Sequence, residues 1–240
     1  VMCEAVGVDC SAKQKPSIQG AQYVHLIVEF VSKFIVAQLL ATEEHIAAAF
    51  KEFCTSHFLP EIVQSDGGGP YESSEFVDFC ASLKIELQRS APYTQAQNYV
   101  AEIGMKVVFV AARAHLLGSG LPLEFWADAV KYAVESINCR WRSDVKSGLT
   151  PYETYHGRRP DVSVMRKFGT PAHVMIHAPD HKQLSSRVEH GVFVGLAQGY
   201  KAWRIFLPHR RAYVISRHVT FGGDLVPMAS PDIKAIEDWD

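Results

Sequence analysis

Three carboxylates in this chain have positions from which they could act together on a phosphodiester. Asp9 precedes a hydrophobic run, Asp66 follows a predicted strand and is itself followed by three glycines, and Glu102 lies early in a predicted helix. Glycines let a metal ion or a phosphodiester approach the backbone closely. Each acid alone is typical of a turn or a helix terminus. Together, carboxylates from three elements can hold one or two Mg²⁺ ions for phosphoryl transfer.

The hydrophobic pattern predicts the elements that would position these acids. A hairpin is expected over residues 23–40, and a helix capped by Thr42 follows it. Further strands are expected over residues 61–65 and 84–89, and further helices over residues 73–83, 100–117 and 121–140. The helix over residues 73–83 is expected to be capped by Ser73 or Ser74. Gly104 lies inside one of these helices, where a glycine costs about 1 kcal/mol. This order of strands and helices predicts an α/β fold with a mixed sheet.

The composition changes near residue 140, which suggests several parts. We expect an α/β core over residues 1–140 and a linker with a short helix over residues 141–165. Strand-like runs over residues 173–178, 191–196, 202–207 and 212–221, separated by turns, then predict a small β-rich module over residues 166–222. An acidic tail over residues 223–240 follows it.

The formal net charge of −2 over 240 residues conceals a segregation of charge. Residues 1–139 carry a net charge of −7, residues 140–217 carry +9, and the remaining tail carries −4. An acidic front half joined to a basic back half suggests contact with nucleic acid. The alternative is that small β-rich modules are often basic by chance.

The composition excludes several other classes of protein. With 48% hydrophobic and 21% charged residues, the chain is neither a disordered nor a fibrous protein. No window approaches the roughly 18 apolar residues of a membrane helix, and the first residues do not have the pattern of a secretory signal. Five widely spaced cysteines predict free thiols rather than a disulfide framework.

Six blocks of the chain carry a family resemblance, in the same order as in the family. They include PSIQGAQYVHLIVEFVSKF (16–34), QSDGGGPYESSEFVDFC (64–80), APYTQAQNYVAE (91–102) and TPYETYHGRRPDVSVMRKFGTPAHV (150–174). The chain resembles the integrase of copia-type LTR retrotransposons, a member of the retroviral integrase superfamily that is cut from a Pol polyprotein. The resemblance implies an RNase H-like core and covers about residues 5–222.

The resemblance also implies catalytic and metal-binding roles for Asp9, Asp66 and Glu102. The 35 residues between Asp66 and Glu102 match the spacing of the family. The three carboxylates would hold two Mg²⁺ or Mn²⁺ ions, which support trimming of an element DNA 3′ end and its joining to target DNA. A gap-free alignment places Val8 in the first position instead of Asp9, so both assignments stay open. Glu29 corresponds to a hairpin acid of the family and not to a metal ligand.

The partners that the resemblance implies are DNA and further copies of the chain, without a membrane or a small-molecule cofactor. Nuclear localisation, or a cytoplasmic particle before import, is expected. The residues expected to contact DNA phosphates are Lys106, Arg140, Arg142, Lys146, Arg158, Arg159, Arg166 and Lys167. Trp141 and Tyr155 lie among them and would stack on unpaired bases, although core packing is an alternative for Tyr155.

Several residues depart from the family pattern around the expected site. Gly67 stands where the family has Asn, Tyr99 where it has Gly, and Ile103 where it has Arg. Two functions from other classes therefore stay open. One is a catalytically inactive, nucleic-acid-binding remnant with the same fold, and the other is a protein-interaction scaffold that uses the helix over residues 121–140.

Overall fold

The computed structural model describes residues 5–66, 69–89, 99–145, 148–175, 188–197, 201–223 and 236. The chain divides into two compact units, one formed by residues 1–110 and 134–160 and the other by residues 111–133 and 161–240. Each unit has a five-stranded sheet. The predicted class, a mixed sheet with helices followed by a β-rich module, is confirmed. The division between the units passes through two helices, whereas the sequence pattern places the first boundary at residue 140.

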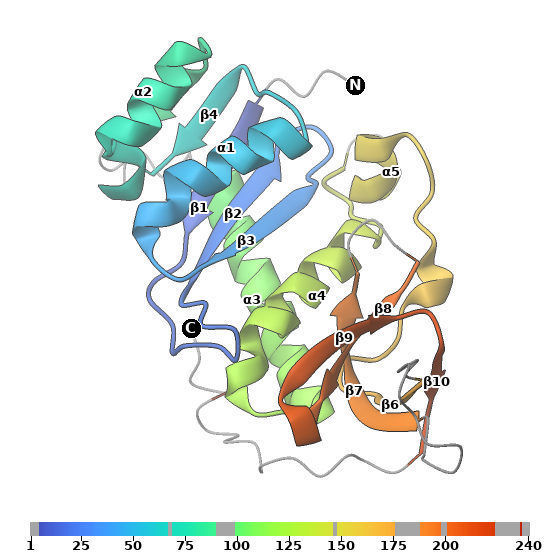
Figure 1. Cartoon of the computed structure of the whole chain (residues 1–240). Helices are drawn as coiled ribbons and strands as arrows, with labels where there is room; N and C mark the ends of the chain where they lie inside the picture. The colour runs from blue at the N-terminus through green and yellow to red at the C-terminus, as the bar shows by residue number, and fades with distance from the viewer. Residues whose placement is uncertain are drawn as a thin grey trace. The chain divides into compact units, whose positions relative to one another are not determined.

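The sheet of the first unit has the strand order β3-β2-β1-β4-β5. Strand β1 pairs antiparallel with β2 and parallel with β4, and β4 pairs parallel with β5 (Figure 1). The predicted hairpin is confirmed, because β2 and β3 pair antiparallel along their length. The strands are β1 (Ala5–Cys10), β2 (Tyr23–Glu29), β3 (Ile35–Leu40), β4 (Ile62–Ser65) and β5 (Glu86–Arg89).

Helices cover both faces of this sheet. Helices α1 (Ile46–Ser56) and α2 (Ser74–Ser82) lie on one face, and α3 (Tyr99–Ser119) begins on the other, as Figure 1 shows. The main apolar core lies under α1 and α2, where Phe50 and Phe76 pack with inward-facing residues of β1 and β4. A sheet buried on both faces explains why β2 is hydrophobic at nearly every position rather than alternating.

The predicted helix starts are right for α2 and wrong for α1. Ser73 caps α2, because its side chain accepts a hydrogen bond from the Phe76 amide at 3.4 Å. Thr42 instead precedes a short 3₁₀ turn, η1 (Glu43–His45), and its side chain accepts no capping bond. Its hydroxyl lies 3.4 Å from Nδ1 of His45, and α1 starts after that residue. A second 3₁₀ turn, η2 (Gly69–Glu72), leads into α2.

Helix α3 agrees with the prediction to within two residues at each end, whereas α4 starts later than predicted. Helix α4 (Trp126–Asn138) comes after a 3₁₀ turn, η3 (Leu123–Phe125). The side chain of its last residue, Asn138, forms two hydrogen bonds with the backbone of β3. Oδ1 of Asn138 accepts from the Ile35 amide at 2.9 Å, and Nδ2 donates to the Ile35 carbonyl at 2.8 Å. Helix α5 (Pro151–His156) starts with a capping box formed by Thr150 and Glu153.

The sheet of the second unit has the order β10-β6-β7-β8-β9, and all of its pairs are antiparallel. The single strand-like run expected over residues 212–221 forms two strands at opposite edges of this sheet. Between them, Oγ of Ser216 accepts from the His218 amide at 3.0 Å, which stabilises the turn that separates them. The elements are η4 (Val162–Val164), β6 (Pro171–Met175), β7 (Val188–Leu196), β8 (Trp203–Leu207), η5 (Pro208–Arg210), β9 (Ala212–Ser216) and β10 (Val219–Phe221).

A buried ion pair connects the first part of α4 to this second sheet. Nη1 of Arg204 lies 2.6 Å from Oδ1 of Asp128, and the Tyr213 hydroxyl donates to Oδ2 at 2.6 Å. Burial raises the pKa of Asp128, while Arg204 and the Tyr213 hydroxyl oppose that shift.

Among the helices of the described ranges, none is long and apolar enough to cross a membrane.

Candidate metal centre

Asp9 and Asp66 lie next to each other at the ends of two paired strands. Strands β1 and β4 are parallel, with Gly7 opposite Gln64. Two residues further along each strand, the same register places Asp9 opposite Asp66, immediately after β4 ends. Neighbouring strands are about 4.8 Å apart. The two carboxylates therefore leave the sheet at adjacent points of one edge.

The alternation of β1 separates Asp9 from Val8. Val8 is fully buried and belongs to the apolar core under α1 and α2. Gly7 lies on the other face, because a Cβ added to it would be 3.2 Å from Cβ of Ala101 on α3. Side chains two residues apart in a strand share a face, so Asp9 points to the α3 side. The structure thus gives Val8 a core position and places Asp9 on the α3 side of β1.

Glu102 follows Ala101 in the first turn of α3, so the contact between Ala101 and Gly7 brings it to the same edge of the sheet. This contact is close because both residues are small. One turn later, Gly104 lies against β2, where an added Cβ would be 2.9 Å from Cγ2 of Val28. A glycine that weakens the helix is therefore required for the distance at which α3 packs on the sheet.

The electrostatics of Asp9 show that the three acids influence each other. Burial raises the pKa of Asp9 to about 6, and the charges of Asp66 and Glu102 add to the shift. A hydrogen bond from the Cys10 amide to Oδ1, at 2.8 Å, acts in the opposite direction and holds the carboxylate in place. A divalent cation would relieve this mutual repulsion, so the donor set fits a hard cation such as Mg²⁺.

The acids are nevertheless not assembled as a finished metal site. Among the described residues, no group of three or more His, Cys, Asp or Glu side chains is spaced to hold an ion. Glu102 and Asp66 are exposed, and Asp9 is half-buried. Residues 67–68 and 90–98, which adjoin Asp66 and α3, lie outside the described residues. The structure brings the three carboxylates to one edge of the sheet without the close spacing of a loaded centre.

Glu29 stabilises the turn of the hairpin. Its carboxylate accepts hydrogen bonds from the Val31 amide at 2.9 Å and from the Ser32 amide at 2.6 Å. These bonds stabilise the turn between β2 and β3. Glu29 is only 2% exposed, so its side chain is buried within the hairpin.

A tyrosine next to the acids was not singled out by the sequence pattern. Tyr71 in η2 is buried, and its hydroxyl has no hydrogen-bond partner among the described residues. Burial raises its pKa well above the usual value, and the charges of Cys10, Asp9 and Asp66 raise it further. Its ring stacks edge-on against Phe76 and lies 5.9 Å from the ring of His25. Two signals were available in the sequence: Tyr71 lies five residues after Asp66, and it belongs to the block over residues 64–80 that carries the family resemblance.

The basic residues expected to contact DNA differ in how free their charges are. Lys106, Arg140 and Lys167 are exposed. Arg142 forms a two-point ion pair with Asp144, with distances of 2.9 and 2.7 Å. Lys146 lies outside the described residues.

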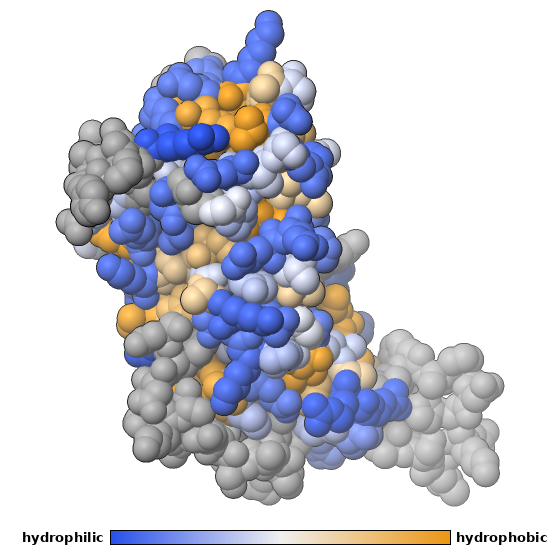
Figure 2. Space-filling model, turned by 90° about the vertical axis from the view of Figure 1, so that its left-hand side faces the viewer, coloured by the Kyte–Doolittle hydropathy of each residue, from blue (hydrophilic) through white to orange (hydrophobic). Residues whose placement is uncertain are grey.

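Figure 2 shows one face of the molecule, on which hydrophilic residues cover much of the surface and hydrophobic residues form smaller groups.

The remaining arginines of this set have protein partners. Arg158 lies over the ring of Tyr152, and Nε of the largely exposed Arg159 is 3.4 Å from Glu153. Arg166 donates to two backbone carbonyls and lies over the rings of Trp203 and Phe221. The phosphate-binding role of Arg159 stays compatible with its exposure, whereas Arg166 is already engaged in packing.

The two aromatic residues expected to stack on bases have different surroundings. Trp141 is 61% exposed. Tyr155 stacks on Phe34 with ring centres 4.2 Å apart, and its hydroxyl lies 3.2 Å from Nδ1 of His57. The packing alternative therefore applies to Tyr155, and Trp141 remains available for stacking.

The fold is that of integrase catalytic cores. The chain superposes on the HTLV-2 integrase catalytic core domain in complex with magnesium (trimeric form) with a TM-score of 0.51 and 18% identity, over 64% of this chain and 97% of that one. It superposes on the BIV integrase catalytic core domain with a TM-score of 0.50 and 20% identity, over 65% and 95%. At these identities the likeness concerns the fold, and the predicted RNase H-like class is confirmed.

The sequence comparisons connect the chain to a retroviral polymerase domain family and to a transposon Pol polyprotein. A family model described as "Retroviral polymerase SH3-like domain" matches residues 170–234, which contain the second sheet. The "Retrovirus-related Pol polyprotein from transposon TNT 1-94" of Nicotiana tabacum is 26% identical over 220 residues, covering 88% of this chain. The chain spans 16% of that relative. The predicted resemblance to retrotransposon integrases is confirmed.

Proposed function

We propose that this chain is the integrase core of a copia-type retrotransposon, a metal-dependent polynucleotidyl transferase that joins element DNA 3′ ends to target DNA. The observation that carries the proposal is the placement of Asp9, Asp66 and Glu102 towards one edge of the sheet, where the strand register puts Asp9 opposite Asp66. Burial, and then the charges of Asp66 and Glu102, raise the pKa of Asp9. The fold of integrase cores and the 35-residue spacing between Asp66 and Glu102 support it.

In this proposal the three carboxylates hold two Mg²⁺ or Mn²⁺ ions. When bound, such ions activate an attacking oxygen and neutralise the charge that develops on the transferred phosphate. The chain itself contributes positioning. The Cys10 amide orients the Asp9 carboxylate, and the contact of Ala101 with Gly7 sets the height of Glu102 above the strand. Lys106, one turn after Glu102 and exposed, would contact the DNA backbone.

The exposed basic residues would supply phosphate contacts further from the reacting end. Arg140 and Lys167 have exposed side chains, and the indole of Trp141 would stack on an unpaired base. Arg142, Arg158, Arg159 and Arg166 have protein partners, so a phosphate would have to compete with them. We therefore expect the first group to account for most of the salt dependence of binding.

A second function has a specific observation in its favour. The described residues hold no finished metal cluster, and Tyr99, 60% exposed, stands where the family has a flexible glycine. A chain with these features would bind DNA without joining it. This alternative predicts DNA binding that falls steeply with salt but is unaffected by Asp66→Asn.

The experiment that separates the two functions is strand transfer with Mn²⁺ and a DNA duplex that carries the preprocessed end of the element. The wild-type chain is run beside Asp66→Asn and beside Asp78→Asn, a matched change of an exposed acid on α2. The integrase proposal requires joined product from wild type and Asp78→Asn but not from Asp66→Asn. DNA binding by all three proteins with product from none would establish the inactive alternative.

Self-association and localisation are further parts of the proposal. The HTLV-2 core domain is described in a trimeric form, and we propose that this chain also forms homo-oligomers. Light scattering after size exclusion, with and without DNA, would test it. Integration requires access to chromosomal DNA, so we propose a nuclear location, either directly or after import of a cytoplasmic particle, which a fluorescent fusion would test.

A further inference from the structure

Two histidines of the second sheet face each other across neighbouring strands. His173 on β6 and His190 on β7 are directly opposite in the antiparallel register. Their ring centres are 4.7 Å apart, and the rings are nearly perpendicular at 84°. This pair belongs to the second unit and is separate from the carboxylates of the proposed active site.

The register explains why the two rings come so close. Pro171 is opposite Val192 and has no amide to donate, so this pair cannot exchange two hydrogen bonds. Bonded and non-bonded pairs alternate along an antiparallel ladder. His173 and His190, two residues further along, are therefore also a non-bonded pair. In such pairs the Cα atoms are about 4.5 Å apart and the side chains approach most closely.

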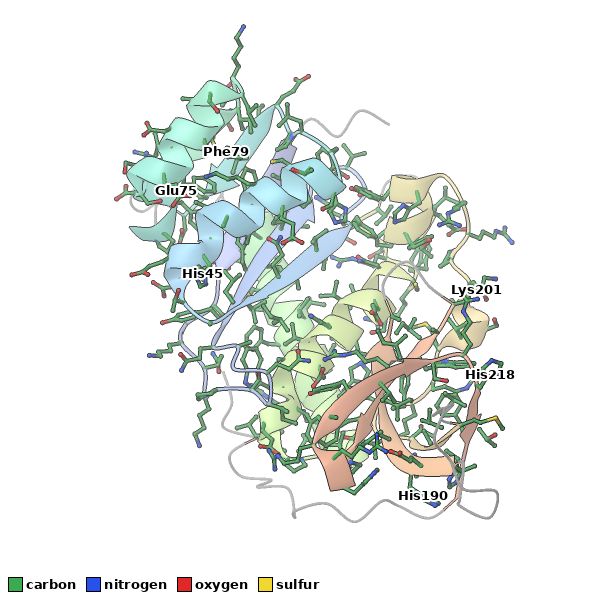
Figure 3. The ribbon with its side chains drawn as sticks, in the orientation of Figure 1. His45, Glu75, Phe79, His190, Lys201 and His218 are labelled. Atoms are coloured by element: carbon green, nitrogen blue, oxygen red, sulfur yellow. The ribbon has the colours of Figure 1, made fainter. Side chains whose placement is uncertain are left out.

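The pair is open to solvent. His190 is exposed and His173 is half-buried, whereas Ala172 and Val174, which point to the other face, are 1% and 2% exposed. Figure 3 labels His190 at the lower rim of this sheet, among side chains that project outward. Gly223 packs close to the His173 ring, because a Cβ added to it would lie 2.9 Å from Nε2. The exposed side of the pair, on which His190 lies, is therefore the side from which an ion would approach.

The distance fits two imidazoles on one metal ion. With a metal–nitrogen bond of about 2.0–2.1 Å, two cis imidazoles have ring centres roughly 4.5–5.2 Å apart. The observed 4.7 Å falls within that interval. Imidazole nitrogens select zinc, nickel and copper rather than Mg²⁺, which prefers oxygen ligands.

We propose that His173 and His190 form a binding site for a divalent transition metal ion such as Zn²⁺ or Ni²⁺. No third His, Cys, Asp or Glu is gathered with them among the described residues, so water completes the coordination. The ion joins β6 to β7 and stabilises the second unit. The site is independent of DNA joining and of the carboxylates.

The test uses the whole chain and Zn²⁺ or Ni²⁺ as the probe. Calorimetric titration is performed on wild type, His173→Gln, His190→Gln and the control His218→Gln, whose residue is exposed near the same sheet. The proposal requires at least a tenfold loss of affinity for one ion in each of the first two variants and none in the control. Wild type should also gain about 3 °C in Tm with excess Zn²⁺, and the two variants should not.

Two further measurements keep the test decisive. The double variant His177→Gln/His181→Gln addresses histidines of the segment between β6 and β7, which lies outside the described residues. The proposal would be overturned if this double variant lost Zn²⁺ or Ni²⁺ binding while His173→Gln and His190→Gln retained it. If a histidine variant unfolds, imidazole nitrogen shifts of wild type are followed during Zn²⁺ addition. His173 and His190 must move together at one equivalent, and resonances that stay in place would also overturn it.

Discussion

Asp9→Asn is expected to stabilise the metal-free chain at pH 7 while removing its response to Mg²⁺. The Asp9 carboxyl has a pKa of about 6 in the folded chain, against 3.8 as its ordinary value. The cause is burial, followed by the charges of Asp66 and Glu102. Asn carries no charge, and its Oδ1 can still accept the hydrogen bond from the Cys10 amide. The substitution therefore removes the repulsion and retains the local contact.

The size and sign of the effect follow from linkage. Because the folded pKa is raised, the folded chain binds this proton more tightly than the unfolded chain, so ionised Asp9 costs stability above pH 4. The cost is about 3 kcal/mol at pH 7 and about 1.6 kcal/mol at pH 5. Asn should recover an amount of that order, and its advantage should shrink as the pH falls from 7 to 5.

Urea unfolding at both pH values, followed by circular dichroism, measures this difference. Asp78→Asn is the control, because an exposed surface acid should change stability by no more than about 0.5 kcal/mol. Mg²⁺ at millimolar concentration should raise the midpoint of wild type and leave that of Asp9→Asn unchanged. A destabilising effect of Asp9→Asn at pH 7, or an advantage that does not change with pH, would refute the reasoning about the three acids.

Three other expectations concern buried residues of the first and the second unit. Gly104→Ala places a Cβ 2.9 Å from Cγ2 of Val28, and the overpacking should outweigh the gain in helix propensity by about 1 kcal/mol, seen as a lower urea midpoint. Burial lowers the pKa of His25 to about 4, so the unfolded chain binds a proton here more tightly than the folded chain. The free energy of unfolding should therefore be about 2 kcal/mol lower at pH 5 than above pH 6.5. His25→Gln should flatten this part of the pH profile, and an identical profile would contradict it. Asp128→Asn leaves the Arg204 guanidinium without its charged partner and should cost about 3–5 kcal/mol in a thermal or urea melt.

Most of the elements could be predicted from local patterns. The hairpin over residues 23–40, the strand before Asp66 and the start of α2 at Ser73 depend on alternation, turn residues and a capping side chain within a few positions. The run over residues 212–221 is a counterexample. It alternates like one strand, but its two halves pair with different neighbours at opposite edges of the sheet, which no local pattern specifies.

The candidate site divides in the same way. The sequence by itself determined which acids to consider and the 35-residue spacing between two of them. Only the tertiary structure showed that Val8 lies in the core and Asp9 on the α3 side, because this depends on which face of β1 is covered by α3. It also decided that Arg166 packs on Trp203 and Phe221 and that Tyr155 packs on Phe34. Short-range backbone preferences are encoded within each segment, whereas burial and charge pairing depend on residues that are distant in the chain and adjacent only after folding.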